Sequence, residues 1–387
     1  MRVAVVMPRG CAMSLDRANS METVARTLAE SSRWKGSLKI ICDEGTAPVP
    51  HLDLLTVPAD LGRKARTEAV ARAIAAFDPE IIEYHQQLGP AELLARRFPD
   101  RINVLHRHTR IKPPTNPLDR YRYRHRLSAF DRLIFVSAAA EREFAADYPS
   151  LANRASVVCN PLDMAGWKNP AGPRENLILF SGRAMAEKGL DSFCAALGQV
   201  LDDRPDWRGA LLLGDWDRHA DWAAPHVAAL ARFGDRVEVH ASAGMDRVRS
   251  VTRRAAIAVT PSRVAEALGL TALEAHAAGA ALISSGRGGL AEASGEHALY
   301  RDPDDVGGMA EAMKALIDQP RLRLRMARAA QARVETDYAP GLWSGRLDDL
   351  RERLVDRTMT IGPGPKPRLG DLMAGLLSGP RETPVAN

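Results

Sequence analysis

The sequence predicts an α/β protein made of two doubly wound domains that face a central cleft. Three observations support this prediction. Short apolar segments alternate with longer segments of helical periodicity, which is typical of parallel sheets covered by helices. A segment rich in Pro, Gly and Asn, residues 160–176, interrupts the alternation, which then restarts. The chain of 387 residues is also longer than one ordinary core requires, and it suits two domains.

The first half of the chain contains seven apolar segments that we expect to be strands. They are rich in Val, Ile and Leu, as strands buried on both faces of a sheet are. They cover residues 2–8, 38–42, 54–58, 80–85, 102–106, 132–137 and 155–160. Helical periodicity predicts the helices between them, at residues 21–32, 64–77 and 138–148. These elements predict an N-terminal, Rossmann-like domain over residues 1–165.

The second half repeats this alternation. Strands are expected at residues 177–182, 209–214, 236–241, 256–262 and 280–286. Helices are expected from residue 304 to about residue 356. The pattern predicts a second Rossmann-like domain over residues 166–340. Residues 341–387 are expected to form a C-terminal helix and then a flexible tail, because the end of the chain is rich in Pro and Gly.

The positive charge of the chain is concentrated in its first part. The net charge is +5, and residues 1–165 alone hold 24 Lys and Arg against 19 Asp and Glu. The densest basic segment is residues 106–126. Such a segment suits nucleic acid, an anionic lipid surface or a phosphorylated small molecule, and an ordinary solvated face is the remaining alternative.

Several features favour a cytoplasmic protein. No apolar segment approaches the roughly 20 residues that a membrane helix needs. The N-terminus leads directly into a predicted strand, without the pattern of a signal peptide. The cysteines form no closely spaced pair, which fits free thiols in a reducing compartment. They are Cys11, Cys42, Cys159 and Cys194.

Ligands of such sheets bind beyond the carboxyl ends of the strands, so the residues that follow the strands are candidates for chemistry. After the predicted strand at residues 256–262, Glu266 and Glu274 lie with seven residues between them. Gly269 precedes a predicted helix, whose N-terminus would attract phosphate. Thr271 and Glu274 also fit a capping box with Thr271 as the N-cap, which explains Glu274 structurally but leaves Glu266 unexplained.

A second group follows the predicted strand at residues 177–182. Arg183 and Lys188 are two cations close to Gly182, and two cations with close backbone approach suit a diphosphate. The segment is not a P-loop, because the pattern GxxxxGK[ST] is absent. A solvated loop would explain the same residues if the segment stood alone. A third segment, residues 284–292, carries three glycines after a strand, and a tight turn is its simplest explanation.

In this order, the motifs resemble the retaining glycosyltransferases of family 4, which have the GT-B fold of two Rossmann-like domains around a central cleft. The resemblance lies in "GR…EKG" at residues 182–189, in the Glu266–Glu274 pair and in "GGLAE" at residues 288–292. The similar segments are residues 175–345, 133–144 and 157–163.

The resemblance implies a site for a nucleotide-diphosphate sugar. Arg183 and Lys188 take the positions of the residues that hold the diphosphate in this family. Backbone amides at Gly269 and Leu270 are implied to contact phosphate, and Gly182 lies where the backbone approaches the donor. With two cations available, a divalent metal is not required, and we expect neither a metal nor a cofactor.

The two carboxylates are implied to bind sugars. Glu266 corresponds to the residue that faces the transferred sugar, and Glu274 to the residue that binds the nucleotide ribose. Two ribose hydroxyls offer one carboxylate a bidentate hydrogen bond, so Glu274 could hold ribose and also cap a helix. Retention of configuration is likewise implied by the resemblance, with the departing phosphate taking the proton of the acceptor.

The first domain departs from the family pattern. Many members have a Gly-Gly pair after the first strand, whereas here Gly10 stands alone and Asn19 and Ser20 lie where the pair is expected. We include Gly10 in the donor site. A histidine after a middle strand often contacts the donor sugar in this family. His106 and His108 are the candidates, and His106 is preferred because it ends the apolar segment.

The expected function is transfer of a hexose from a UDP- or GDP-hexose to a saccharide or lipid-linked acceptor, in cell-surface polysaccharide or lipopolysaccharide synthesis. The basic segment lies in the domain that the resemblance assigns to the acceptor. We therefore expect peripheral docking on the anionic inner face of the cytoplasmic membrane.

Three alternatives were weighed against this function. The order of the motifs argues against a sugar-nucleotide epimerase on the same scaffold. The absence of GxGxxG after a strand argues against a nicotinamide-dependent dehydrogenase. Tyr121 and Tyr123 belong to no RNP-like motif, so no nucleic-acid partner is expected.

Overall fold

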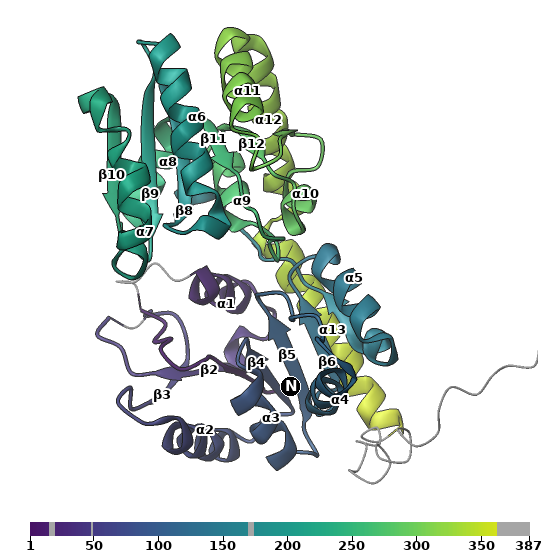
Figure 1. Cartoon of the computed structure of the whole chain (residues 1–387). Helices are drawn as coiled ribbons and strands as arrows, with labels where there is room; N and C mark the ends of the chain where they lie inside the picture. Colours follow the sequence, from purple (N-terminus) through teal and green to yellow (C-terminus); the bar gives the residue numbers. More distant parts are fainter. Residues whose placement is uncertain (15–19, 48, 169–173, 362–387) are drawn as a thin grey trace, which may run out of the picture.

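The computed structural model describes residues 1–14, 20–47, 49–168 and 174–361. Within them the chain forms two parallel β-sheets, each flanked by helices, with one lobe above the other in Figure 1. The strand orders are β3-β2-β1-β4-β5-β6-β7 and β10-β9-β8-β11-β12-β13. Each order runs outward in both directions from its first strand, as in doubly wound folds. The predicted α/β architecture of two doubly wound sheets is confirmed.

The first sheet contains all seven strands that the sequence predicts. Its strands are β1 (Val3–Val6), β2 (Leu38–Asp43), β3 (Leu54–Val57), β4 (Ile81–His85), β5 (Ile102–Arg107), β6 (Arg132–Phe135) and β7 (Ala155–Val157). The central strands β1 and β4 are buried at every residue. Their mainly Val and Ile side chains pack under helices on both faces, which is why these strands show no alternation with polar residues.

In the part of the chain that the structure describes, five α-helices connect the strands of the first sheet. They are α1 (Ser20–Glu30), α2 (Arg63–Phe77), α3 (Leu88–Arg97), α4 (Pro117–Leu127) and α5 (Ala138–Asp147). Helix α4 lies inside the basic segment and begins with Asn116 as its N-cap and Pro117 in its first turn. Both choices are typical of helix starts. Asn19 is one of the two residues that stand where the family has its Gly-Gly pair, and it lies outside the described residues.

The second sheet contains the five expected strands and one more. Its strands are β8 (Glu175–Arg183), β9 (Arg208–Gly214), β10 (Val237–Ala241), β11 (Ala255–Thr260), β12 (Ala281–Ser284) and β13 (Ala298–Tyr300). The sequence did not predict β13, because its three residues stand between charged residues and form no longer apolar segment. Of the Pro- and Gly-rich segment 160–176, residues 169–173 lie outside the described residues.

The helices of the second lobe follow the strands in turn. They are α6 (Leu190–Asp203), α7 (Trp216–Ala228), α8 (Met245–Arg254), α9 (Leu270–Ala277), α10 (Gly289–Ser294), α11 (Val306–Asp318) and α12 (Pro320–Asp337). A short 3-10 helix, η4 (Ala186–Lys188), joins β8 to α6. The expected helical region after residue 304 is therefore confirmed.

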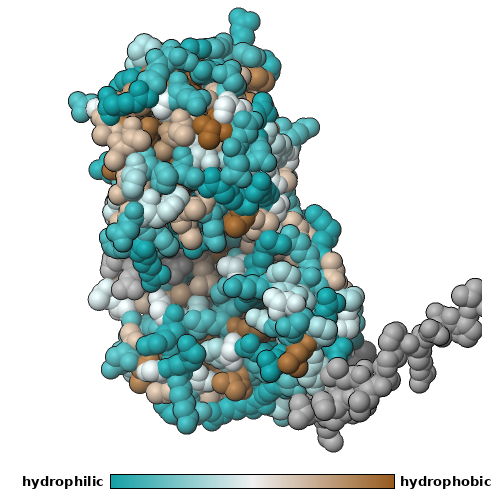
Figure 2. Space-filling model, in the orientation of Figure 1, coloured by the Kyte–Doolittle hydropathy of each residue, from teal (hydrophilic) through white to brown (hydrophobic). Residues whose placement is uncertain are grey.

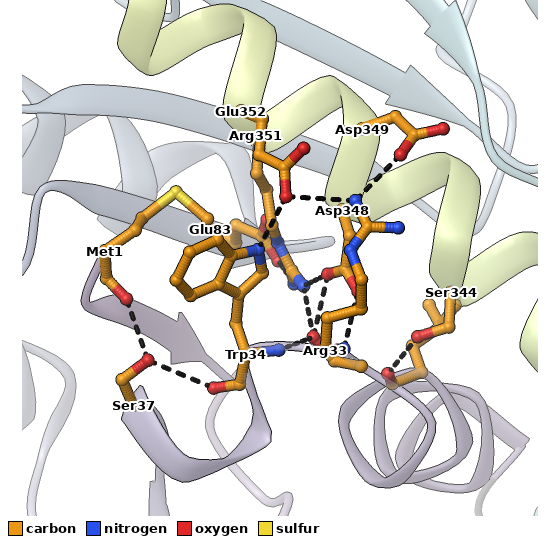
Figure 3. Close-up of polar contacts among 12 residues, drawn as sticks. Met1, Arg33, Trp34, Ser37, Glu83, Ser344, Asp348, Asp349, Arg351 and Glu352 are labelled. Atoms are coloured by element: carbon orange, nitrogen blue, oxygen red, sulfur yellow. Dashed lines mark hydrogen bonds and ion pairs between the residues drawn. The ribbon is translucent and has the colours of Figure 1, made fainter.

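The last helix, α13 (Pro340–Ile361), returns from the second lobe to the first and packs beside α1 (Figures 1 and 3). Arg351 donates from Nε and Nη2 to the two carboxylate oxygens of Glu83 on β4, at 2.7 Å each. Asp348 accepts from the Ser32 hydroxyl at 2.7 Å. The C-terminal helix thus completes the packing of the first sheet. The expected flexible tail, residues 362–387, lies outside the described residues.

Among the residues that the structure describes, none of the helices combines the length and the apolar character needed to cross a membrane.

Candidate functional site

A cavity of about 530 Å³ lies between the two lobes, where the carboxyl ends of both sheets meet. Figure 2 shows the recess between the lobes from one side. The first lobe contributes Ser20, His108, Thr109 and Asn160 to the lining. Most of the predicted donor-site residues line the cavity from the second lobe. They are Gly182, Arg183, Lys188, Glu266, Gly269, Leu270 and Glu274.

Lys188 and Glu266 are ion-paired in this cavity. The Lys188 Nζ atom contacts Glu266 Oε1, and both side chains are about one-fifth exposed, at 18% and 20%. The Ser262 hydroxyl donates to the same carboxylate oxygen at 2.7 Å. A partly buried carboxylate is costly unless it is paired, and here it has a cation and a hydroxyl. The pair places one positive and one negative group at the centre of the cleft wall.

Arg183, at the end of β8, is exposed at the edge of the cavity. Its guanidinium has no ion-pair partner among the described residues. A planar, always charged group in this position is suited to bidentate contact with phosphate oxygens. Arg183 and Lys188 therefore form a pair of cations on one wall, as the sequence predicts.

The turn before α9 depends on Gly269. This residue has φ +96°, and a Cβ atom would lie 2.5 Å from Cδ2 of Leu290. Only glycine adopts this backbone easily in such a confined place. Gly269 is the N-cap of α9, and no side chain satisfies the amides of the first turn. Those amides lie at the cavity, where an anion would complete their hydrogen bonds.

The predicted capping box is wrong. Thr271 is not the N-cap, because α9 begins at Leu270 and Thr271 lies inside its first turn. Glu274 consequently has no capping role, and its carboxyl group lines the cavity. Burial raises the pKa of Glu274 to about 8, against the opposing charge of Arg249. A carboxyl group in this environment gains from hydrogen-bond donors, such as a pair of sugar hydroxyls.

The glycine-rich segment before α10 supports the carboxylate loop from behind. The amide of Gly289 donates to the carbonyl oxygen of Glu266 at 2.8 Å. A Cβ atom on Gly288 or on Gly289 would lie 2.5 Å from the carbonyl oxygen of Glu266 or Ala267, respectively. These glycines therefore allow two backbone segments to touch, which fixes the position of Glu266.

Arg263 links the two loops that carry Lys188 and Glu266, and sequence reasoning missed it. It bonds to both carboxylate oxygens of Asp191, at 2.6 and 3.0 Å, and to Asp304 at 2.6 Å. It also donates to the carbonyl oxygen of Ala186 in η4 at 2.7 Å. These contacts hold the loop that carries Lys188 against the loop that carries Glu266.

The structure separates the predicted residues of the first lobe. Gly10 does not line the cavity, and its amide donates to Asp43 at 2.7 Å. His106 is 3% exposed and lies 3.5 Å from Glu83, away from the cavity wall. His108 lines the cavity instead. The sequence favoured His106 because this residue ends the apolar segment. However, β5 continues to Arg107, and the His106 side chain is buried inside the first lobe.

The family comparison covers both lobes. Residues 175–319 match the family described as "Glycosyl transferases group 1", and residues 31–165 match "Glycosyltransferase Family 4". A glycogen synthase of Mycobacterium tuberculosis is 34% identical over 221 residues, which are 54% of this chain and 50% of that protein. A D-inositol 3-phosphate glycosyltransferase of Streptomyces avermitilis is 28% identical over 228 residues, which are 54% of this chain and 49% of that protein. The chain spans about half the length of these curated relatives.

Solved structures share the whole architecture. A sucrose-phosphate synthase from Thermosynechococcus elongatus has a TM-score of 0.74 at 17% identity, covering 92% of this chain and 100% of that one. HepE of Anabaena, in complex with UDP and glucose, has a TM-score of 0.75 at 15% identity. The match covers 91% of this chain and 100% of that one. The family matches to both lobes and the common fold lead to one conclusion. This chain belongs to the family 4, group 1 glycosyltransferases, and it has the GT-B fold.

Proposed function

We propose that the protein transfers a hexose, with retention of configuration, from a nucleotide-diphosphate sugar to a saccharide or lipid-linked acceptor. One observation carries this proposal: two cations and an uncapped helix start share a cavity with two carboxylates. The cavity volume of about 530 Å³ suits a ligand of this size. HepE of Anabaena was solved with UDP-glucose, which supports UDP-hexose as the first donor to test, with GDP-hexose second.

The diphosphate is the part of the donor that this site binds most directly. Arg183 and Lys188 supply two positive charges, and the amides at Gly269 and Leu270 supply N–H donors beside them. Glu274 would accept hydrogen bonds from the ribose. When the bond between the sugar and the diphosphate breaks, negative charge develops on the leaving oxygen. The two cations stabilise that charge electrostatically, without needing a metal ion.

The transferred sugar would lie between Glu266 and His108. Positive charge develops on the sugar ring as the leaving group departs, and the Glu266 carboxylate, which lines the cavity from the second lobe, would stabilise it. Donor binding would draw Lys188 toward the diphosphate and release Glu266 to the sugar. The departing phosphate would take the proton of the acceptor, so the residues of the chain need not supply a base.

The acceptor would reach the cleft from a membrane surface. Helix α4 presents Arg120 and Arg122, both exposed, close to Leu118, which is 55% exposed. Two other arginines of the basic segment are engaged: Arg126 pairs with Glu92 at 2.8 Å, and Arg124 stacks on an aromatic ring. An exposed leucine on the same helix as two arginines that have no ion-pair partner among the described residues suits an anionic lipid interface. We propose peripheral docking at the cytoplasmic face, in cell-surface polysaccharide or lipopolysaccharide synthesis.

Turnover of a panel of donors tests the proposed reaction. UDP-glucose, ADP-glucose and GDP-mannose are each incubated with the full chain, with and without saccharide acceptors, and the released nucleoside diphosphate is measured. The proposal expects release from at least one donor and an α-configured product from an α-configured donor, seen by NMR. Inversion at the anomeric carbon would refute the retaining mechanism. An epimerised donor formed without acceptor would establish the epimerase instead.

A further inference from the structure

A row of three histidine rings runs from the cavity into the first lobe. His108 lines the cavity, and its Nε2 atom lies 2.8 Å from Nδ1 of His85 on β4. The His85 ring also stacks on His106, with centroids 4.5 Å apart and planes 7° apart. His85 and His106 are both 3% exposed. The ring at the cleft is therefore held by a second ring that no ligand can reach.

The inner end of the row is fixed by charge. His106 lies 3.5 Å from Glu83, whose carboxylate is bound on both oxygens by Arg351 of α13 (Figure 3). Burial alone would raise the pKa of Glu83, but the Arg351 charge and hydrogen bonds, with a smaller contribution from His106, hold it well below its usual value. The Glu83 carboxylate is therefore ionised, and the positive charge of Arg351 compensates its negative charge.

The same cluster is a poor site for a metal ion. The ligand atoms of Glu83, His85 and His106 lie within 4.8 Å of one another, close enough for one ion to bridge. The Arg351 guanidinium, however, already occupies both oxygens of Glu83. A divalent ion would have to displace a buried positive charge or lie beside it, and both are electrostatically costly. The cluster is better explained as a rigid support.

The hydrogen bond between His85 and His108 leaves one nitrogen for a ligand. Burial, with the charges of nearby groups, lowers the pKa of His85 well below its usual value and that of His108 to about 3. Both rings are therefore neutral at physiological pH, and one donates to the other. Nε2 of His108 is committed to this bond. Nδ1 has no protein partner among the described residues.

The backbone around the pair is also constrained. Gln86, which follows His85, has a left-handed φ of 66° although it is not glycine. Its side chain accepts from the amides of His108 and Thr109, at 3.0 and 3.2 Å. Such an unfavourable conformation persists only where surrounding contacts enforce it. The segments after β4 and β5 are thus joined at the point where His108 enters the cleft.

From this geometry we infer that His85 is a positioning residue, which orients His108 and commits its Nε2 atom so that Nδ1 faces the transferred sugar. The inference rests on the proposed function, since it assigns His108 to the donor sugar. His85 itself touches no substrate. The groups that face His85 are Glu83 on its own strand, His106 and His108 from the neighbouring segment, and Arg351 from α13.

Two substitutions at His85 separate positioning from packing. His85→Phe keeps a buried ring but removes the hydrogen bond, whereas His85→Asn places an amide near the Nδ1 position and can keep it. We expect His85→Phe to lower kcat for release of nucleoside diphosphate by about 10-fold to 100-fold, as a misplaced group does. His85→Asn should recover much of this loss. Affinity for UDP or GDP should stay within about twofold in both variants, because the phosphate contacts lie on the other lobe.

A double-mutant cycle tests whether His85 acts through His108. His108→Ala should lower kcat about as much as His85→Phe, and the double variant should be no worse than His108→Ala alone. His226→Phe, on α7 and outside the cleft, controls for the histidine-to-phenylalanine change. Losses that add in the double variant would overturn the inference, because they would show independent roles.

Imidazole NMR separates failure of this inference from failure of the proposed reaction. In the wild-type protein the His108 ring should remain neutral between about pH 5 and pH 8. In His85→Phe, or in His85→Asn if the first variant does not fold, the His108 ring shifts should change, which shows a lost or altered partner. A wild-type His108 that titrates near its ordinary pKa of about 6.5 would overturn the inference even if donor turnover is confirmed. If no donor is turned over, the proposed function fails, and the NMR result stands on its own.

Discussion

The ammonium group of Lys188 is bound to the carboxylate of Glu266. The two residues come from loops that follow different strands, β8 and β11. The Ser262 hydroxyl donates to the same carboxylate oxygen that Lys188 contacts. The pair is only partly buried, so a diphosphate can reach the lysine. Donor binding would exchange one anionic partner of Lys188 for another and leave Glu266 for the sugar. Most predictions for the site follow from this exchange.

The two cations should be needed for both binding and catalysis. Replacing Arg183 or Lys188 with Ala should weaken binding of nucleoside diphosphate and lower kcat by about 100-fold to 1,000-fold, the usual effect of losing one group that stabilises developing negative charge. Calorimetry and donor turnover measure the two effects separately. Arg321→Ala, an exposed arginine on α12, serves as the control. Wild-type kinetics in both site variants would show that the diphosphate binds elsewhere.

Glu266 should matter for transfer more than for nucleotide binding. Glu266→Gln removes the negative charge while keeping the shape, and the Ser262 hydroxyl can still donate to the remaining oxygen. We expect affinity for UDP or GDP to be kept or slightly increased, because Lys188 loses its competing partner, while kcat falls by about 100-fold or more. If the nucleotide affinity falls instead and kcat is unchanged, the carboxylate does not face the sugar.

Nucleotide binding should depend on pH through Glu274. In the free protein, burial raises the pKa of Glu274 to about 8, so the carboxyl group is mostly protonated below that pH. Ribose hydroxyls favour the ionised form, so binding should release a proton. Affinity should therefore rise as pH increases from about 7 and level off above about 8. Calorimetry in buffers of different ionisation enthalpy detects the proton, and Glu274→Gln should remove the pH dependence. Equal pH dependence in both proteins would contradict this assignment.

Breaking the buried pair between Arg351 and Glu83 should strongly destabilise the first lobe. Arg351→Met leaves an uncompensated buried carboxylate and should cost about 3–5 kcal/mol in the free energy of unfolding, measured with a chemical denaturant. Because the pKa of Glu83 is lowered in the folded state, its stabilising contribution is present above its unfolded pKa of about 4.3 and is lost as the pH falls toward the folded value. A loss below about 1 kcal/mol would mean that the pair is solvated.

Docking on membranes should require the exposed arginines of α4. Vesicles containing anionic lipid should sediment the protein at low salt and release it at high salt, since the attraction falls off over about 8 Å at physiological ionic strength. Replacing Arg120 and Arg122 with Ser should weaken binding more than replacing Arg124 and Arg126, which already have partners in the protein. Equal sedimentation on neutral vesicles would contradict this proposal. A salt-dependent gel shift with nucleic acid would indicate instead that the basic segment binds nucleic acid.

The sheets could be predicted because their strands are short, buried and rich in Val, Ile and Leu. Strand β13 was missed because its apolar residues stand between charged ones, whereas β7, which is equally short, begins a longer apolar segment. Helix α4 was not predicted because its charges obscure any apolar periodicity, although Asn116 and Pro117 are ordinary signals of a helix start. Thr271 was misassigned because its spacing to Glu274 fits a capping box, although the N-cap lies two residues earlier, at Gly269.

The second-lobe residues that line the cavity could be predicted because they lie at the ends of two neighbouring strands, β8 and β11, or in the segments that follow them. Arg263 could not, because its partner Asp191 lies 72 residues away in the sequence. Arg351 and Glu83 are separated by 268 residues, and no local spacing connects them. The choice between His106 and His108 depended on where β5 ends, and the end of a strand is not sharply encoded. Long-range polar pairs are set by the packing of the fold, which local patterns do not contain.

Equilibrium binding of UDP, GDP and ADP tests the donor site most directly. Each nucleotide is titrated into the wild-type protein and into the Lys188→Ala and Glu274→Ala variants, by calorimetry and by thermal unfolding. We predict that at least one nucleotide binds the wild-type protein and stabilises it by about 2.7 kcal/mol at 100 times its dissociation constant, and that both variants bind it more weakly. If none of the three nucleotides binds, or if both variants bind with wild-type affinity, the cleft is not the donor site and the account is wrong.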